Sequence, residues 1–170
     1  VLDATGGTLD AVYQNAAFAI PGAVEDMPTD ALRSIFEANF FGWHALTRAV
    51  LPTMRAQGHG RIIYCSSVLG IVAAPWRGAY VASKFALKGL VDTLRIEMRD
   101  TPLHFILIEP GPITSLFRKN AIPQFEKWVR WQDSPRADQY RETLLKRLYR
   151  ESQPDRFELP PDAVVHKIIH

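Results

Sequence analysis

Cysteine, long apolar runs and net charge are all scarce in this sequence of 170 residues. The single cysteine, Cys65, excludes a disulfide within the chain and a cysteine-rich zinc cluster, and it favours a reducing compartment. The five histidines show no metal-ligand spacing, so we expect no metal site. No run of about 18 uncharged apolar residues predicts a membrane-spanning helix. The formal charge of +2 is too small and dispersed to predict a nucleic-acid partner.

What is present favours one soluble domain. Hydrophobic residues make up 47% and charged residues 22%, which is enough apolar material for a core. The chain opens on Val-Leu-Asp, without a methionine or a basic segment followed by an apolar one, so we expect no signal peptide. The predicted location is the cytoplasm.

Short apolar stretches alternate with long helical patterns. Residues 9–14, 61–65 and 103–108 have the length and apolar content of buried strands. Apolar residues at three- and four-residue spacing predict helices over residues 30–55 and 77–98. Alternating strands and helices predict an α/β fold, a doubly wound, Rossmann-like parallel sheet with helices over both faces.

A helical segment is predicted over residues 115–151, and residues 160–170 predict the start of a further helix. The whole chain, residues 1–170, is therefore expected to be a single domain whose core spans residues 1–114. Both ends look cut, because the first strand of such a fold is missing and the last helix has no C-cap signal.

Four polar residues stand out against these elements. Tyr80 and Lys84, four apart, share one face of a predicted helix, and Ser67 follows a strand at the sheet edge where ligands bind. Asn39 lies inside a long apolar helix, where asparagine is a mediocre helix former. Taken singly, each has an ordinary explanation: an exposed tyrosine beside a lysine, or a tolerated polar residue.

Together these residues resemble a known family. Asn39, Ser67, Tyr80 and Lys84 match, in order and approximate spacing, the catalytic tetrad of the short-chain dehydrogenases/reductases. Asn15-Ala16-Ala17 resembles that family's Asn-Asn-Ala-Gly motif, and residues 110–114 resemble its Pro-Gly segment. The sequence is most similar to the compact branch that includes retinol and 17β-hydroxysteroid dehydrogenase-like enzymes.

The resemblance implies an NAD(P)-dependent oxidoreductase that transfers hydride between the cofactor and an alcohol or carbonyl substrate. Tyr80 would exchange a proton with the substrate oxygen, and Lys84 would lower the pKa of Tyr80 and hold the nicotinamide ribose. Ser67 would hydrogen-bond the substrate oxygen, and Asn39 would hold a water linked to Lys84. The implied cofactor-binding residues are Asn15, Ala17, Tyr80, Lys84, Pro110, Gly111, Ile113 and Thr114.

The sequence also departs from the family pattern. The Gly-rich turn that binds the cofactor pyrophosphate is absent, and with it the residue that selects NAD or NADP. Ala17-Phe18 stands where Ala-Gly is usual. We therefore expect that about a third of a family member precedes Val1 and that the isolated chain is inactive.

Other predictions concern partners and alternatives. Aromatic and aliphatic residues crowd residues 115–151, which predicts a substrate lid over an apolar small molecule; an amphipathic helical pair packed on the sheet is the alternative. The helices from Asp30 and Arg77 are predicted to form the interface of a homodimer or homotetramer. The functional alternatives are a non-catalytic cofactor sensor or scaffold, and an epimerase or dehydratase of the extended branch.

Overall fold

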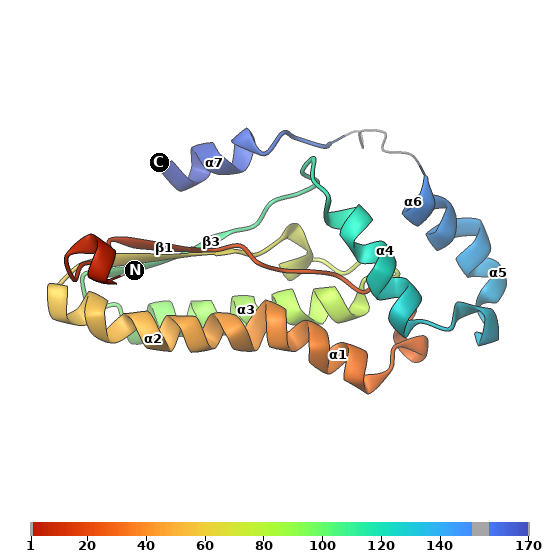
Figure 1. Cartoon of the computed structure of the whole chain (residues 1–170), viewed down its shortest axis with the longest axis horizontal. Coiled ribbons are helices and arrows are strands. Elements are labelled where there is room, and N and C mark those ends of the chain that lie inside the picture. The colour runs from red at the N-terminus through yellow and green to blue at the C-terminus, as the bar shows by residue number, and fades with distance from the viewer. Residues whose placement is uncertain (1, 151–156, 170) are drawn as a thin grey trace.

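The computed structural model describes residues 2–150 and 157–169, and Figure 1 shows their arrangement. Three parallel strands form one sheet in the order β1-β2-β3. They are β1 (Ala11–Gln14), β2 (Gly60–Cys65) and β3 (Leu103–Ile108). The register pairs Tyr13 with Ile63 and Ile63 with Ile106 across the sheet. All three predicted strands are confirmed, and the third has the predicted limits.

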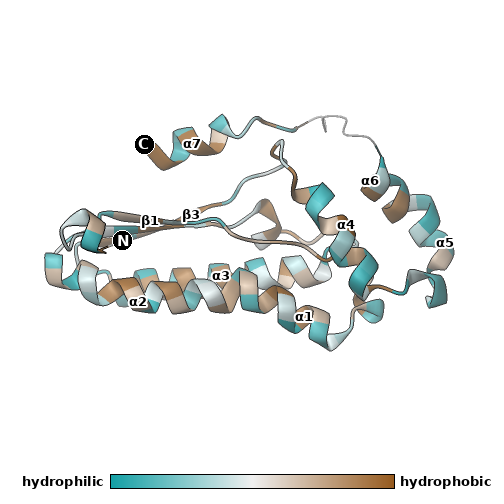
Figure 2. Cartoon of the chain, viewed as in Figure 1, coloured by the Kyte–Doolittle hydropathy of each residue, from teal (hydrophilic) through white to brown (hydrophobic). Residues whose placement is uncertain are grey.

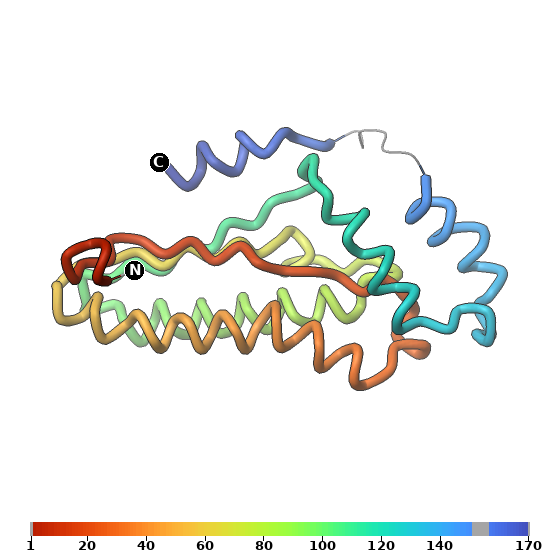
Figure 3. The backbone as a smooth tube through the Cα atoms, in the orientation of Figure 1, coloured from red at the N-terminus to blue at the C-terminus, as the bar shows by residue number. Residues whose placement is uncertain are grey.

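Two long helical stretches connect the strands. The first runs without a break through α1 (Thr29–Phe36), the π-helical turn η3 (Glu37–Phe41) and α2 (Gly42–Gln57), as Figure 3 shows. The second is α3 (Gly78–Glu97). Gly58 ends α2 in the left-handed conformation that glycine adopts at helix ends, with φ of 76°. Both predicted helices are confirmed to within about two residues at each end.

Both long helices pack on the same face of the sheet (Figure 1). Right-handed crossovers that step along a sheet in one direction put every connecting helix on one side. Helices α2 and α3 therefore cover one face of the sheet. Helix α7 (Asp162–Ile169) lies on the other side of the sheet in Figure 1 and contains no buried residue. The fold is a parallel, Rossmann-like α/β sheet of which this chain contains part.

The helical face of the sheet is covered by a cluster of apolar residues that we call the sheet cluster. Figure 2 shows apolar and polar residues alternating along α2 and α3, so that each helix has one face for this cluster and one for solvent. Its buried members are Trp43, Met54, Ile62, Tyr64, Leu87, Val91, Leu103 and Phe105. A buried polar chain runs beside it, in which the Gln14 amide donates to Thr47 Oγ1 at 3.0 Å.

The helical segment after β3 forms a second layer at the carboxyl end of the sheet (Figure 1). It comprises α4 (Phe117–Trp128), the short turn η5 (Trp131–Asp133), and a stretch formed by α5 (Ala137–Gln139), η6 (Tyr140–Leu145) and α6 (Lys146–Tyr149). The prediction of helix over residues 115–151 holds in this form, and Glu151 lies outside the described residues. Short turns η1 (Leu2–Thr5), η2 (Val24–Asp26) and η4 (Val68–Gly70) complete the chain.

This segment packs into a second apolar cluster, the segment cluster. It contains Phe125, Val129, Tyr140, Leu144 and Leu148 of the segment together with Ala19, Ile20, Ala31, Ile35, Ala79 and Tyr80. Three polar contacts fasten it: the Tyr140 hydroxyl donates to Asp26 at 2.8 Å, Ser134 donates to Asp26 at 2.7 Å, and Arg136 pairs with Glu25. The segment is therefore fastened to the loop between β1 and α1.

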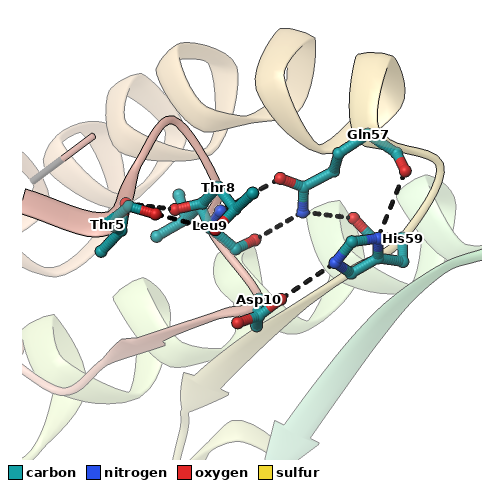
Figure 4. A network of polar contacts seen from close by, with 6 residues as sticks. All are labelled: Thr5, Thr8, Leu9, Asp10, Gln57 and His59. Carbon is teal, nitrogen blue, oxygen red and sulfur yellow. Dashed lines mark hydrogen bonds and ion pairs between the residues drawn. The ribbon is translucent and has the colours of Figure 1, made fainter. Parts of the chain in front are cut away.

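A polar network secures the opposite end of the sheet. Figure 4 shows the Gln57 side chain between the start of β1 and the turn into β2. Its amide oxygen accepts from Leu9 N at 3.0 Å, and its amide nitrogen donates to the Leu9 and His59 carbonyls at 2.8 and 2.7 Å. His59 contacts Asp10 at 2.9 Å.

Within the described residues, no helix is both long and apolar enough to cross a membrane.

Candidate active site

The predicted residues Ser67, Tyr80 and Lys84 come together at the carboxyl end of β2. Ser67 follows this strand directly, and helix α3 crosses the strand end so that Tyr80 and Lys84 face it. Tyr80 is 8% exposed and Lys84 1% exposed. Ser67 Oγ accepts from Leu69 N at 3.1 Å, which starts η4, and it also hydrogen-bonds the Tyr80 hydroxyl. The hydroxyl groups of Ser67 and Tyr80 therefore lie next to each other at the carboxyl edge of the sheet.

Lys84 is held by the sheet rather than by an acid. Its Nζ donates to the Cys65 carbonyl at 2.8 Å and lies 4.5 Å from the centre of the Trp43 ring and 5.6 Å from that of Tyr80. Burial lowers the pKa of Lys84 to about 8, and only the nearby Cys65 acts in the opposite direction. The ammonium group is therefore still mostly protonated at neutral pH but close to its titration range.

Burial has the largest effect on the pKa of Tyr80. Burial raises it to about 12, while the hydrogen bond from Ser67 and the positive charge of Arg77 act to lower it. Lys84 Nζ lies 5.6 Å from the centre of the Tyr80 ring.

Asn39 lies behind this group at the centre of the π-helical turn and is fully buried. Its amide donates to the Phe18 carbonyl at 2.9 Å and to Ser83 Oγ at 3.2 Å, and its oxygen accepts from Phe18 N at 3.1 Å. The side chain therefore joins the loop after β1 to α3, beside Lys84. Both amide hydrogens are in use, which leaves only an oxygen lone pair for the predicted water.

The predicted cofactor-binding residues outside α3 lie on the loops after β1 and β3. Asn15 is exposed and accepts from the Tyr13 hydroxyl at 3.2 Å, and Ala17 is half-buried. The Pro110 carbonyl accepts from Val68 N at 2.9 Å, which joins the loops that follow β2 and β3. The remaining three, Gly111, Ile113 and Thr114, lead away from β3 toward the residue 159 region, where Thr114 N donates to the Leu159 carbonyl at 3.0 Å.

In the part of the chain that the structure describes, three buried polar atoms without a hydrogen-bond partner lie at this edge. Gln14 Oε1 ends β1, Ser66 Oγ follows β2 and Glu109 Oε1 follows β3. Buried polar atoms are normally paired, so an unpaired one at each of three neighbouring strand ends fits a polar ligand such as a nicotinamide cofactor.

Among the described residues, no group of three or more His, Cys, Asp or Glu is arranged to hold a metal ion.

Three contacts were missed from the sequence. Trp43 provides the ring over Lys84 and donates its indole N–H to the Ala16 carbonyl at 2.9 Å. Phe117 packs edge-on against Tyr80 with ring centres 5.3 Å apart. Arg77 interacts electrostatically with Tyr80. Their spacing, four residues after Asn39 for Trp43 and three before Tyr80 for Arg77, is the one sequence signal that could have found them.

Comparison with known proteins identifies the family of this chain. A family model described as short chain dehydrogenase matches residues 1–125. The chain belongs to this family. It is 36% identical over 170 residues to the uncharacterized oxidoreductase YbbO of Escherichia coli strain K12, covering 100% of this chain and 56% of that protein. It is 34% identical over 118 residues to human 17-beta-hydroxysteroid dehydrogenase type 1, covering 69% and 36%.

A solved structure supports the fold assignment. The closed form of serine dehydrogenase complexed with NADP+ superposes with a TM-score of 0.73 at 21% identity, covering 94% of this chain and 57% of that chain. The chain spans about half the length of the relatives with which it aligns throughout. The predicted family membership and fold are confirmed.

Proposed function

We propose that the complete protein is an NAD(P)-dependent oxidoreductase acting on an alcohol–carbonyl pair. The observation that carries this proposal is the convergence of Ser67, Tyr80 and the carbonyl-bound Lys84 at the carboxyl end of β2. The NADP+ bound to the related serine dehydrogenase supports the cofactor class, and the unpaired polar atoms at the strand ends support its location. The cofactor would supply or accept the hydride.

The side chains of this site would handle the proton and the substrate oxygen. Because burial raises the pKa of Tyr80 to about 12, Tyr80 carries its proton at neutral pH, which is the state required of a donor to a carbonyl oxygen. Ser67, already hydrogen-bonded to Tyr80, would donate to the same oxygen as charge develops on it. Lys84 would contact the nicotinamide ribose and keep a positive charge near the site.

The cofactor would be held by residues on three loops. Asn15 and Ala17 after β1, and the four predicted residues of the Pro-Gly segment after β3, would flank Tyr80 and Lys84. NAD and NADP are both compatible with this half of the site. Asn39 would hold the loop after β1 against α3 through its hydrogen bonds to Phe18 and Ser83. We propose that the isolated 170-residue chain is inactive, because the pyrophosphate-binding turn is not part of it.

We propose that the substrate is largely apolar and that residues 115–149 act as its lid. The similarity to a relative named as a steroid dehydrogenase supports this, as do the exposed side chains of Leu116 and Phe117, of which Phe117 packs against Tyr80. The other aromatic residues of the segment give less support than expected. Phe125 and Tyr140 are buried in the segment cluster, as an amphipathic helical pair would bury them.

A cytoplasmic homodimer or homotetramer remains part of the proposal. Helices α1, α2 and α3 and the turn η3 leave large apolar side chains uncovered in this chain, which supports an interface on these helices. They include Leu32, Phe41, Leu46, Phe85 and Ile96.

The proposal is tested by Tyr80→Phe in the complete protein. The variant keeps the ring and its contact with Phe117 but loses the proton, so kcat should fall by far more than tenfold while cofactor affinity is retained. Steady-state kinetics and cofactor titration measure the two effects. Retention of more than about a tenth of kcat, a loss of about 1.4 kcal/mol, would remove Tyr80 from the proposed role.

A further inference from the structure

Trp43, near the start of α2, contacts two parts of the candidate site at once. Its ring lies 4.5 Å from Lys84 Nζ on α3, and its indole N–H donates to the Ala16 carbonyl at 2.9 Å. Ala16 lies between Asn15 and Ala17, two of the predicted cofactor-binding residues. Trp43 is 4% exposed and Lys84 1% exposed, so the contact between ring and ammonium is shielded from water.

Asn39 makes the same kind of bridge one turn earlier in the helical stretch. Its amide joins Phe18 of the loop after β1 to Ser83 of α3. Trp43 lies four residues later and joins the same loop to the next residue of α3. Two successive side chains of one helical stretch therefore hold the same loop against the same helix.

Further contacts fix the orientation of the Trp43 ring. The ring stacks on Tyr64 of β2, with centres 6.3 Å apart and an angle of 29° between the planes. Thr47 Oγ1 donates to the Trp43 carbonyl at 2.8 Å. Because its one hydrogen is used there, Thr47 accepts from the Tyr64 hydroxyl at 2.8 Å, and it also accepts from the Gln14 amide at 3.0 Å. These contacts leave the ring little freedom to turn away from Lys84.

The ring is one of few negative partners available to the buried ammonium of Lys84. Within residues 2–150 and 157–169, no carboxylate lies within ion-pair distance of it. Its Nζ has the Cys65 carbonyl at 2.8 Å and two aromatic rings, of which Trp43 at 4.5 Å is nearer than Tyr80 at 5.6 Å. The face of an aromatic ring is negative, most strongly in tryptophan, and it attracts a cation more when both are desolvated.

We propose that Trp43 is a positioning residue, which holds the Lys84 ammonium in place and fixes the cofactor-binding loop at Ala16. The inference rests on the proposed function, in which Lys84 contacts the nicotinamide ribose, and adds a residue to it. Burial already lowers the pKa of Lys84 to about 8. A further fall of about one unit on loss of the ring would leave about half of the molecules with a neutral lysine at pH 7.

Fluorination of Trp43 in the complete protein tests the contact with the ammonium. Fluorine withdraws electrons from the ring face with little change in shape, and tryptophan with one to three fluorine atoms can be placed at this position by nonsense suppression. Heteronuclear NMR of isotopically labelled lysine follows the titration, and Lys84→Arg assigns the signal. The pKa of Lys84 should fall stepwise with the number of fluorine atoms, by about half a unit to one unit in total.

The matched control is fluorination of Trp128, whose ring lies at the same distance, 4.5 Å, from the Nζ of an exposed lysine. It should leave the titration of Lys84 unchanged. The titratable groups beside Lys84 are Cys65 of β2 and Tyr80 of α3, and because every protein compared keeps both, their effects cancel. An unchanged or raised Lys84 pKa after fluorination of Trp43 would overturn the inference, because the ring would then do no more than exclude water.

Trp43→Phe tests the contact with the loop. The variant keeps a ring beside Lys84 but leaves the Ala16 carbonyl without its donor, so the cofactor KM should rise about threefold or more while kcat changes less. Fluorinated Trp43 keeps the indole N–H, and at about pH 6, where Lys84 stays charged, its cofactor KM should match that of the wild type. Equal cofactor KM in Trp43→Phe and wild type would show that Trp43 does not fix the loop.

The NMR titration needs no turnover, so it separates this inference from the proposed function. If the complete protein reduces no carbonyl compound but the Lys84 titration follows the fluorine series, the contact between Trp43 and Lys84 stands and the proposed function fails. If the titration does not follow the series, the positioning role is wrong whatever the activity.

Discussion

Lys84 allows a quantitative test of how much the burial of its charge destabilises the folded protein. The side chain is 1% exposed, and burial lowers its pKa from 10.5 to about 8. That difference corresponds to about 3 kcal/mol by which folding disfavours the charged lysine. Lys84→Met removes this penalty, but it also removes the hydrogen bond to the Cys65 carbonyl, which contributes about 1.5–3 kcal/mol. At neutral pH, loss of the burial penalty stabilises the variant, whereas loss of the hydrogen bond destabilises it.

The pH dependence separates these effects. Between about pH 8 and 10.5 the folded wild type has released the Lys84 proton while the unfolded chain still binds it. The unfolded state then binds more protons, so wild-type stability rises with pH relative to the methionine variant. The stability difference should shift toward the wild type by about 2 kcal/mol from about pH 8 to about pH 9.5. Tyr80 is present in both proteins, so its own titration cancels.

Urea unfolding of the complete protein at several pH values measures this difference. Lys88→Met is the control, because Lys88 lies one turn further along α3, and Asp92 raises its pKa by hydrogen bonding. Its removal should leave the stability difference unchanged between about pH 8 and 9.5, because Lys88, with its pKa raised above 10.5, is protonated in both the folded and the unfolded state over this range. A Lys84→Met difference that stays constant or moves toward the variant as pH rises would refute the account of Lys84 as a buried, destabilising charge.

Three further predictions concern the surroundings of the site. Asn39→Leu removes three hydrogen bonds and leaves both Phe18 backbone groups unpaired, so unfolding in urea should show a loss of about 3 kcal/mol or more. Tyr140→Phe removes the hydroxyl shared by Ala23 N and Asp26; we expect faster limited proteolysis within residues 117–149, and unchanged cleavage would contradict the fastening role. Phe41→Arg adds a charge to an exposed aromatic of the proposed interface and should lower the sedimentation coefficient, unless the wild type is already monomeric.

The sequence was sufficient for the elements and for the identity of the central residues. Short apolar runs and period-3.6 patterns are local features of the chain, so residues 103–108 and the two long helices could be recognised without knowing their neighbours. Tyr80 and Lys84 share a helix face for the same reason. Ser67 follows a strand and therefore lies at the sheet edge where a parallel fold binds ligands.

Tertiary packing alone decided the electrostatics and the use of the apolar residues. The pKa of Tyr80 rises because the segment cluster buries it, and no spacing of residues along the chain reports that burial. The aromatics of residues 115–149 fill this cluster because α4 and α6 pack against α1 and the loop after β1. A periodic pattern specifies which face of a helix is apolar, but the partner that this face meets, and the charge beside it, depend on how the layers stack.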